Sequence, residues 1–397
     1  MEWKKLSQLV ERKICYGIVQ PGKGKNGNIP VIKVNNIISG LKSITELDTT
    51  THEIASKFQR TQLFGGEIVV SVVGSVGNTA IVPSSFKGCN LVRATAMVDI
   101  KDKVLATYVM YYFKTHEAQK YIESRLNTTV QATLNIKDLE EMPIPILQSS
   151  IILRLVSILS ALDSKIENNN KINANLETQA EALFKSWFVD FTPFKDQPFV
   201  DSELGPIPQG WKVGKLTDIA IFLNGLAMQK FPPQDIKDSF PVLKIKELGA
   251  GICDNSSDRC SNKVPKKYII EDGDIIFSWS GTLMVDVWCG GQCGLNQHLF
   301  KVSSSNYPKW FYYHWTKKHL RDFIHIARDK AVTMGHIKRG HLDNALVVVP
   351  NNFILEKATH LFEPLLNMVI SKRIENQRLA ALRDTLLPKL MSGEIKL

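Results

Sequence analysis

Residues 151–188 read IILRLVSILSALDSKIENNNKINANLETQAEALFKSWF, and this stretch decides the architecture of the chain. Its seam residues step by alternating three and four positions over five repeats, which is the heptad spacing of a coiled coil. The seam comprises Ile152, Leu155, Leu159, Leu162, Ile166, Asn169, Asn173, Leu176, Ala180, Leu183 and Trp187. We therefore predict one long helix, and we expect Asn169 and Asn173 to set its register at some cost in stability.

Five segments of the first half return in the second half in the same order. The segments beginning at Trp3, Pro30, Gly66, Asn135 and Ser164 recur at Trp211, Pro241, Gly273, His336 and Lys372, with offsets of 201 to 211 residues. Five collinear matches indicate a duplication whose period is one domain plus one tail. We expect the two repeated domains at 1–148 and 211–350 and their helical tails at 149–190 and 351–397. A Pro- and Gly-rich linker is expected at 191–210.

The two domains read as mixtures of strands and helices. Apolar or alternating runs bounded by Gly and Pro predict strands at 31–34, 68–73, 79–82, 242–245, 274–278 and 345–349. Helices are expected around 106–124 and 310–326. The fold class is therefore α+β, with two repeated mixed domains and two long helices.

The second tail carries a looser apolar stripe. Its members are Phe362, Leu366, Val369, Ile370, Ile374, Leu379, Leu382, Leu386 and Leu390. Pro364 should kink this helix or mark its start. Because a lone helix cannot bury its own seam, we expect the two tails to pack on each other; the alternative is that each packs back on its own domain.

Charge and composition narrow the class of protein. The 397 residues include 49 Lys plus Arg against 39 Asp plus Glu, a net charge of +10, and 44% are hydrophobic. No apolar run reaches the roughly 18 residues that span a bilayer, and the longest candidate, 151–162, contains Arg154. No apolar signal region follows the N-terminus, so we expect a cytoplasmic protein without membrane contact. The positive excess favours nucleic acid as partner, the alternative being a merely basic surface.

Enzymatic motifs are missing or misplaced. Residues 22–27 read GKGKNG but precede Pro30 and a strand rather than a helix, which argues against dinucleotide binding. Their lysines suit DNA phosphates, although a plain solvated loop is the alternative. No Walker A motif, no base-holding motif of an amino-methyltransferase and no nuclease centre is recognisable. A methyltransferase or nuclease acting alone is therefore disfavoured.

Four of the six cysteines lie in the second mixed domain, near His298. These are Cys253, Cys260, Cys289 and Cys293. Only Cys289 and Cys293 have a spacing typical of zinc ligands, and the first domain has no equivalent set. We favour buried free thiols and no metal, and zinc stays the alternative.

Polar and basic residues in the loops next to the repeated strands are the candidate contacts to double-stranded DNA. They are Lys23, Lys25, Asn26, Lys33, Asn35, Ser71, Ser75, Asn78, Arg93, Thr129, Gln131, Thr133, Gln229, Lys230, Lys244, Lys246, Ser278, Ser280, Thr282, Gln297, His298, Thr333, His336 and Lys338. The frameworks repeat but the loops differ, which predicts two readers with unlike base preference.

Four motifs make the chain resemble a type I restriction-modification specificity subunit. They are Leu162-Asp-Ser-Lys-Ile-Glu-Asn, Leu183-Phe-Lys-Ser-Trp-Phe-Val-Asp-Phe, Gly205-Pro-Ile-Pro-Gln-Gly-Trp and Leu379-Ala-Ala-Leu-Arg-Asp-Thr-Leu-Leu-Pro-Lys-Leu. Thr129-Val-Gln and Leu134-Asn-Ile-Lys-Asp-Leu also match the end of a family recognition domain. The resemblance covers essentially the whole chain, because the order of the motifs matches as well.

The resemblance implies two target-recognition domains and an antiparallel coiled coil related by a pseudo-twofold axis. It implies a non-catalytic DNA reader that docks two modification subunits and, through them, two restriction subunits. S-adenosylmethionine, ATP and magnesium would belong to those partners, and this chain would bind no cofactor. The competing functions are a stand-alone or fused methyltransferase or nuclease and a coiled-coil adaptor with no role on DNA.

One departure from the family pattern concerns the starts of the helices. The family usually has a Pro-rich stretch and Glu-Gln there, whereas this chain has Ile146-Leu-Gln-Ser-Ser in the first copy and Asn351-Asn in the second. Because Ser or Asn can cap a helix, we expect both helices to form despite this departure.

Overall fold

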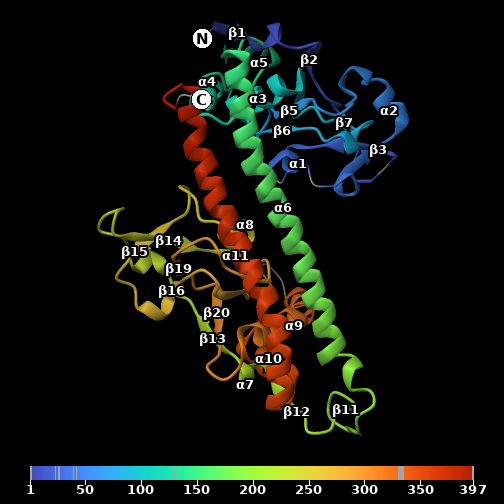
Figure 1. The fold of residues 1–397 in the computed structure, drawn as a ribbon, viewed down its shortest axis with the longest axis vertical. Helices are drawn as coiled ribbons and strands as arrows, with labels where there is room; N and C mark the ends of the chain where they lie inside the picture. The colour runs from blue at the N-terminus through green and yellow to red at the C-terminus, as the bar shows by residue number, and fades with distance from the viewer. Residues whose placement is uncertain are drawn as a thin grey trace. The chain divides into compact units, whose positions relative to one another are not determined.

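The computed structural model describes residues 2–22, 24–25, 27–38, 40–41, 43–127, 131–329 and 335–395 (Figure 1). The chain divides into two compact units. Unit 1 comprises Met1–Asp163 and Ala381–Leu397, and unit 2 comprises Ser164–Ala380. The division cuts both long helices, so each unit holds one mixed domain together with a part of each helix.

Unit 1 is built on two small sheets and a strand pair. The four-stranded antiparallel sheet has the order β2 (Arg12–Tyr16), β8 (Thr95–Asp99), β5 (Ile68–Ser71) and β6 (Thr79–Ile81). The other strands are β4 (Asp48–Thr50), β3 (Ile29–Ile32) and β7 (Asn90–Leu91) in one sheet, and β1 (Glu2–Lys5) with β9 (Pro143–Ile146) as a pair. Its short helices are α1 (Val34–Ile38), α2 (His52–Ser56), α3 (Lys103–Phe113), α4 (His116–Glu123) and α5 (Ile136–Glu140).

Unit 2 repeats this plan. Its antiparallel sheet has the order β13 (Ile221–Asn224), β20 (Leu299–Ser303), β17 (Ile275–Ser278) and β18 (Met284–Val287). The second sheet comprises β15 (Arg259–Ser261), β14 (Ser239–Leu243), β19 (Cys293–Leu295) and β16 (Ile269–Ile270), and the pairs are β12 (Lys212–Lys215) with β21 (Leu346–Val349) and β10 (Phe199–Val200) with β11 (Ile207–Pro208). The helices are α7 (Leu216–Ile219), α8 (Ile245–Ala250), α9 (Lys309–Asp329) and α10 (Arg339–Asp343).

Strand register confirms that the two mixed domains have the same fold. It corrects the match of Trp3 with Trp211, because Trp3 lies opposite Pro145 in β1–β9 as Val213 lies opposite Val348 in β12–β21. The parallel pair β3–β7 sets Val31 opposite Asn90, and the parallel pair β14–β19 sets Val242 opposite Gly294. Both pairs are flanked by an antiparallel strand, β4 in one unit and β15 in the other. A parallel pair inside an otherwise antiparallel domain is uncommon, so its recurrence is strong evidence of duplication.

The two long helices are α6 (Ser149–Phe188) and α11 (Asn352–Met391), and within each unit their segments lie side by side (Figure 1). In unit 1, Arg383 donates to Asp163 at 2.7 Å. In unit 2, Asn169 donates to Asn376 at 2.9 Å, and Arg373 donates to Glu177 at 2.8 Å. Rising numbers on α6 meet falling numbers on α11, which confirms the antiparallel pairing.

Most of the heptad seam is buried as expected. Leu155, Leu159 and Asn169 have no exposed surface, and the other seam positions of α6 are buried or half-buried. Leu382 was expected in the α11 seam, but it is 47% exposed, and Leu387 is buried instead. The apolar stripe of α11 drifts around the helix because 3.6 residues per turn do not match a heptad. Arg383, Leu387 and Leu390 therefore share the inward face.

Two further expectations need correction. α11 begins at Asn352 and continues through Pro364, so that proline does not mark its start; Asn351 caps it by accepting from the Ile354 amide at 3.0 Å. The helix expected at 106–124 is two helices, because Thr115 caps α4. The segment 191–210 connects α6 to β12, as expected of the linker, and Phe194 within it is buried.

The core of unit 2 is rich in aromatic rings. Trp310 of α9 stacks on Phe362 of α11 with centroids 4.4 Å apart, and Phe188 of α6 lies 5.6 Å from Trp310. Trp211 packs against Phe194 at 5.0 Å. The helix segments of unit 2 therefore pack on the mixed domain as well as on each other. The expected pairing of the two tails and the alternative, packing on the domain, both occur.

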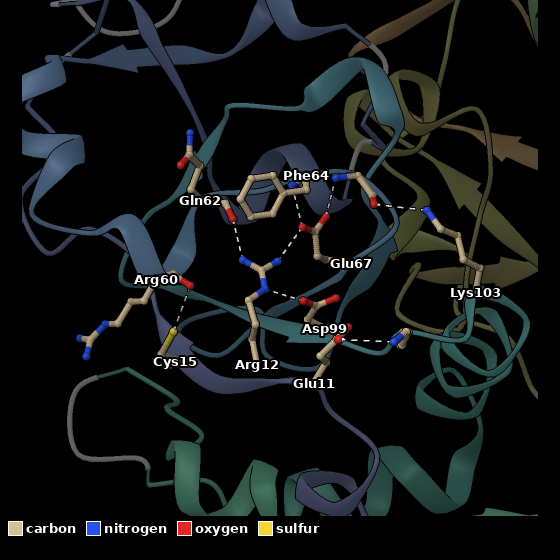
Figure 2. A network of polar contacts seen from close by, with 11 residues as sticks. Glu11, Arg12, Cys15, Arg60, Gln62, Phe64, Glu67, Asp99 and Lys103 are labelled. Carbon is tan, nitrogen blue, oxygen red and sulfur yellow. Dashed lines mark hydrogen bonds and ion pairs between the residues drawn. The ribbon is translucent and has the colours of Figure 1, made fainter.

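A partly buried ionic network joins the strands of unit 1 (Figure 2). Arg12 of β2 donates to Asp99 of β8 and, at 2.7 Å, to Glu67, which precedes β5. Glu67 is 2% exposed and also accepts from the amides of Phe64 and Gly65 at 2.6 and 2.8 Å. The network fixes the loop before β5 to the edge strand of the sheet.

In the described part of the chain no helix carries an apolar stretch long enough to cross a membrane.

Candidate nucleic-acid interface

A loop cluster in unit 2 collects several of the candidate contacts around Trp279, which directly follows β17. The Trp279 indole nitrogen donates to the Asn224 side chain at 3.0 Å. Its ring lies 6.1 Å from that of His298 and 6.3 Å from that of His336. Ser280 forms a β-bridge with His336, so residues nearly sixty positions apart form one surface.

Backbone hydrogen bonds hold this cluster in place. The Ile337 amide donates to the Trp279 carbonyl at 3.1 Å, and the Gly281 amide donates to the Gly335 carbonyl at 3.0 Å. A hollow of about 310 Å³ beside the loop is lined by Thr282 and Arg328 among others. The cluster therefore offers hydrogen-bonding groups, an aromatic face and a cation, the groups that base and phosphate contacts need.

Unit 1 has the same pattern of backbone hydrogen bonds in its loops, but with different side chains. The Leu134 amide donates to the Val72 carbonyl at 2.9 Å, and the Gly74 amide donates to the Ala132 carbonyl at 2.8 Å. Val73 bridges Thr133 as Ser280 bridges His336. The hydrogen bonds match one for one, so Val72 occupies the place of Trp279, and Thr133 that of His336. The sequence match of Asn135 with His336 was therefore wrong by two positions, because Asn135 precedes α5 as Lys338 precedes α10.

Strand register extends the match to the neighbouring loop. β5 pairs Ile68 with Val98, and β17 pairs Ile275 with Val302, so Arg93 corresponds to Gln297. Arg93 is exposed, and no carboxylate in the described part of the chain pairs with its side chain. An unpaired surface cation at this place is suited to a phosphate or to a guanine edge.

Two matched serines support the loops instead of facing outward. Ser71 is fully buried; its hydroxyl donates to the Ser75 carbonyl at 2.6 Å and accepts from the Asn78 amide at 2.9 Å. Ser278 is also fully buried and donates to the Ser280 carbonyl at 3.2 Å. These hydroxyls close the turns, so Ser71 and Ser278 are too buried to contact DNA directly. Ser280 is 6% exposed, and its role is to hold the loop through its β-bridge with His336.

The matched lysines of the two second sheets already have partners. Lys33 forms an ion pair with Asp48, and Lys244 forms one with Asp258. Lys25 donates to the Thr45 carbonyl at 2.8 Å. A lysine at such a surface pair exchanges partners easily, because exposed ion pairs contribute little stability.

The other candidates are distributed as follows. Exposed side chains belong to Asn35, Ser75, Gln131, Gln229, Lys230, Lys246, Thr282 and Lys338. Asn78 is half-buried, and its amide donates to the Ser75 carbonyl at 2.9 Å. Lys23, Asn26, Thr129 and Thr333 lie outside the described residues.

Sequence reasoning missed Trp279 and Asn224. The signal was present in Ser278-Trp279-Ser280, where a large aromatic follows a buried strand and the first copy has Val72. Its ring is half-buried and lies 5.7 Å from that of Phe300, so the contacts that hold it beside the loop come from the folded core.

The cysteines of unit 2 lie mainly in its interior. Cys260, Cys289 and Cys293 are buried, and Cys253 is half-buried beside Cys293. Burial raises the pKa of Cys289 to about 11, which keeps this thiol protonated. Among the residues that the structure describes, no three His, Cys, Asp or Glu side chains are grouped closely enough to hold a metal ion.

Comparison with known proteins gives consistent results. A family model described as the type I restriction modification DNA specificity domain matches residues 1–178 and 208–379. The chain is 31% identical over 310 residues to the type I restriction enzyme MjaIX specificity subunit of Methanocaldococcus jannaschii, covering 75% of this chain and 70% of that protein. It is 25% identical over 368 residues to the HindI specificity subunit of Haemophilus influenzae, covering 74% and 78%.

A solved structure supports the fold. The type I restriction-modification system S subunit from M. genitalium aligns over 98% of this chain and 95% of that one, with a TM-score of 0.54 and 16% sequence identity. At that identity the likeness concerns the fold alone. The two family matches coincide with the two copies of the mixed domain and most of both helices, and the chain therefore belongs to the type I restriction modification DNA specificity domain family.

Proposed function

We propose that this chain is the sequence-specific DNA-binding subunit of a type I restriction-modification complex. The observation that carries the proposal is the loop frame found twice with unlike side chains: Val72 and Thr133 in unit 1 against Trp279 and His336 in unit 2. Shared backbone geometry places both loops alike, and different side chains give different base preference.

Residues 1–148 and 211–350 would each read one half of a bipartite, non-palindromic site. The two helices would set the spacing, since forty residues of α-helix measure about 60 Å, or one to two turns of DNA. Affinity would come from Lys and Arg at phosphates, in keeping with the net charge of +10.

The partners would be double-stranded DNA, two modification subunits docked on the helices and two restriction subunits bound through them. The chain would be cytoplasmic and non-catalytic by itself. S-adenosylmethionine, ATP and magnesium would then bind to the partners, which would carry the chemistry.

A domain exchange tests the proposal. The chain is co-expressed with its modification subunit, and methylated sites in the host DNA are mapped before and after residues 211–350 are replaced by the second reader of another family member. One half-site should change while the other half and the gap persist. A change in both halves, or a continuous palindromic target in the wild type, contradicts the two-reader proposal.

Two simpler measurements separate the competing functions. Methyl transfer by the purified chain alone would support a stand-alone enzyme. Failure to retain DNA on a filter at both low and moderate salt would support an adaptor with no role on DNA, because phosphate contacts strengthen steeply as salt falls.

A further inference from the structure

A tight turn joins β7 to β8 in unit 1, and a matching turn joins β19 to β20 in unit 2. The first turn runs from Val92 to Thr95, whose amide donates to the Val92 carbonyl at 2.9 Å. The second runs from Asn296 to Leu299, whose amide donates to the Asn296 carbonyl at 3.0 Å. The two segments, 92–95 and 296–299, therefore have the same backbone geometry, and we call them the tip turns.

A glycine beside each tip turn lets another backbone segment pass close to it. A Cβ atom at Gly17 would lie 2.1 Å from the Leu91 carbonyl oxygen, and one at Gly225 would lie 2.2 Å from the Asn296 carbonyl oxygen. Only glycine leaves room for so close an approach. Both tip turns are therefore supported by an earlier segment of the chain, which holds their geometry.

The tip turns are hydrogen-bonded to the loops of the candidate interface. The Val72 amide donates to the Ala94 carbonyl at 2.9 Å, and the Trp279 amide donates to the His298 carbonyl at 3.4 Å. Each turn therefore borders the loop that follows β5 or β17. A side chain that points outward from the tip lies on the same surface as the other candidate contacts.

Burial and polarity select one position in each tip turn. The ends of both turns are at most 9% exposed, and these residues are Val92, Thr95, Asn296 and Leu299. Of the two tip positions, one carries Ala94 and His298, and alanine has no polar group. The other carries Arg93, which is exposed, and Gln297, which is half-buried with its side-chain nitrogen 3.4 Å from Nε2 of His298. Only this position has a hydrogen-bonding side chain in both units.

Arginine and glutamine prefer different bases. Arginine donates two hydrogen bonds to O6 and N7 of guanine, whereas the glutamine amide donates to N7 and accepts from N6 of adenine. Both patterns lie on the major-groove edge of a purine, so one backbone geometry serves either base. A phosphate contact explains only Arg93, because the neutral amide of Gln297 has little attraction for an anion.

We propose that each tip turn reads one purine: Arg93 pairs with a guanine in the half-site of unit 1, and Gln297 pairs with an adenine in the half-site of unit 2. The inference rests on the proposed function and deepens it, because it names one residue and one base in each half. Since the backbones match, the difference in base follows from the side chain alone. Exchanging the two side chains therefore exchanges the two base preferences.

The first experiment uses the full chain co-expressed with its modification subunit, and the methylated motif is mapped in the host DNA. Arg93→Gln should replace one G·C pair of the motif by A·T in one half-site. Gln297→Arg should replace one A·T pair by G·C in the other half-site. The matched controls are Arg60→Gln and Gln209→Arg, which make the same changes at exposed positions outside the tip turns and should leave the motif unchanged.

A binding measurement covers a variant that no longer methylates. The purified complex is titrated with synthetic duplexes that carry the mapped site, with and without the exchanged base pair. Arg93→Gln should bind the original duplex about tenfold more weakly and regain its affinity on the duplex with A·T at that position. Gln297→Arg should show the same rescue by G·C in the other half.

Two results would overturn the inference alone. One is an unchanged base preference in either variant, while the exchange of residues 211–350 still alters one half-site. The other is weaker binding of Arg93→Gln to every duplex alike, which assigns Arg93 to a phosphate. The absence of a bipartite motif in the wild type would overturn the proposed function and this inference together.

Discussion

The side-chain nitrogen of Asn169 on α6 donates to the side-chain oxygen of Asn376 on α11 at 2.9 Å, and also to Glu375 at 3.0 Å. Asn169 has no exposed surface, so this polar contact is made inside the helix pair. Asn173, one turn further, is 6% exposed, and the side-chain oxygens of both asparagines have no hydrogen-bond partner among the described residues. The two asparagines differ in the side-chain nitrogen, because that of Asn169 bonds across the helix pair, which suits the register role predicted for it.

Replacing Asn173 by Leu should stabilise the chain by about 1–2 kcal/mol, because it removes a buried polar atom that lacks a partner. Asn169→Leu should stabilise the chain less than Asn173→Leu does, or destabilise it, since Asn376 and Glu375 lose their hydrogen-bond donor. Urea unfolding of both single variants measures the difference. The register role also predicts that the double variant changes half-site spacing or assembly with modification subunits; unchanged spacing and assembly would contradict it.

Glu67→Ala should cost about 3 kcal/mol. The change leaves the amides of Phe64 and Gly65 without their acceptor and removes one of the two acids that hold Arg12. The matched control is Glu53→Ala, which breaks the exposed 3.3 Å pair with Lys57 and should change stability by no more than about 0.5 kcal/mol. Equal costs in urea unfolding would mean that the Arg12 network is not structural.

The stability of unit 2 should depend on His314. Burial among Phe184 and Phe362 lowers the pKa of this histidine to about 3, from an ordinary 6.5. Below pH 6.5 the unfolded chain takes up a proton that the folded chain does not, so acid lowers stability. Between pH 7.5 and 5.0 this single group should contribute a loss of about 2 kcal/mol.

The variant His314→Phe should remove that share of the pH dependence, because no proton is then taken up at this position on unfolding. Urea midpoints followed by tryptophan fluorescence at the two pH values measure it. His52→Ala, which changes an exposed histidine of α2, is the control and should keep the wild-type difference. An unaltered difference in His314→Phe shows that other groups cause the loss.

Trp279→Ala should relax base preference in one half-site only. The change removes the donor to Asn224 and the ring beside His298 and His336, so the reading surface of unit 2 loses its order. A lost base contact should cost roughly 1–3 kcal/mol at one position of the site. Methylation mapping measures it, with Ile221→Ala as the control in the same unit. Equal loss on all sequences would instead indicate a phosphate contact.

The variant Arg93→Ala tests whether the exposed Arg93 side chain of unit 1 contacts a phosphate or a base. If its exposed guanidinium contacts a phosphate, the variant should bind all sequences more weakly, and the slope of log affinity against log salt should fall by about 1. Filter binding at several salt concentrations measures this slope. An unchanged slope together with relaxed preference at one base pair assigns Arg93 to a base edge.

The sequence by itself determined the duplication, the two long helices and most of the seam. Heptad spacing from Ile152 to Trp187 and the match of Gly66 with Gly273 are local properties of the chain, which depend on backbone geometry and on repetition alone. Even there the phase of α11 escaped prediction, because only packing decides whether Leu382 or Leu387 faces inward.

Only the tertiary structure decided which loop residues face outward. Ser71 and Ser278 have the composition of contact residues, but turns that close on distant strands bury them. Trp279 becomes part of a surface because residues near 336 pair with it across more than fifty positions. The type of each residue can be read directly from the sequence. Its burial depends on contacts between segments that are far apart in the sequence, and these contacts form only when the whole domain folds.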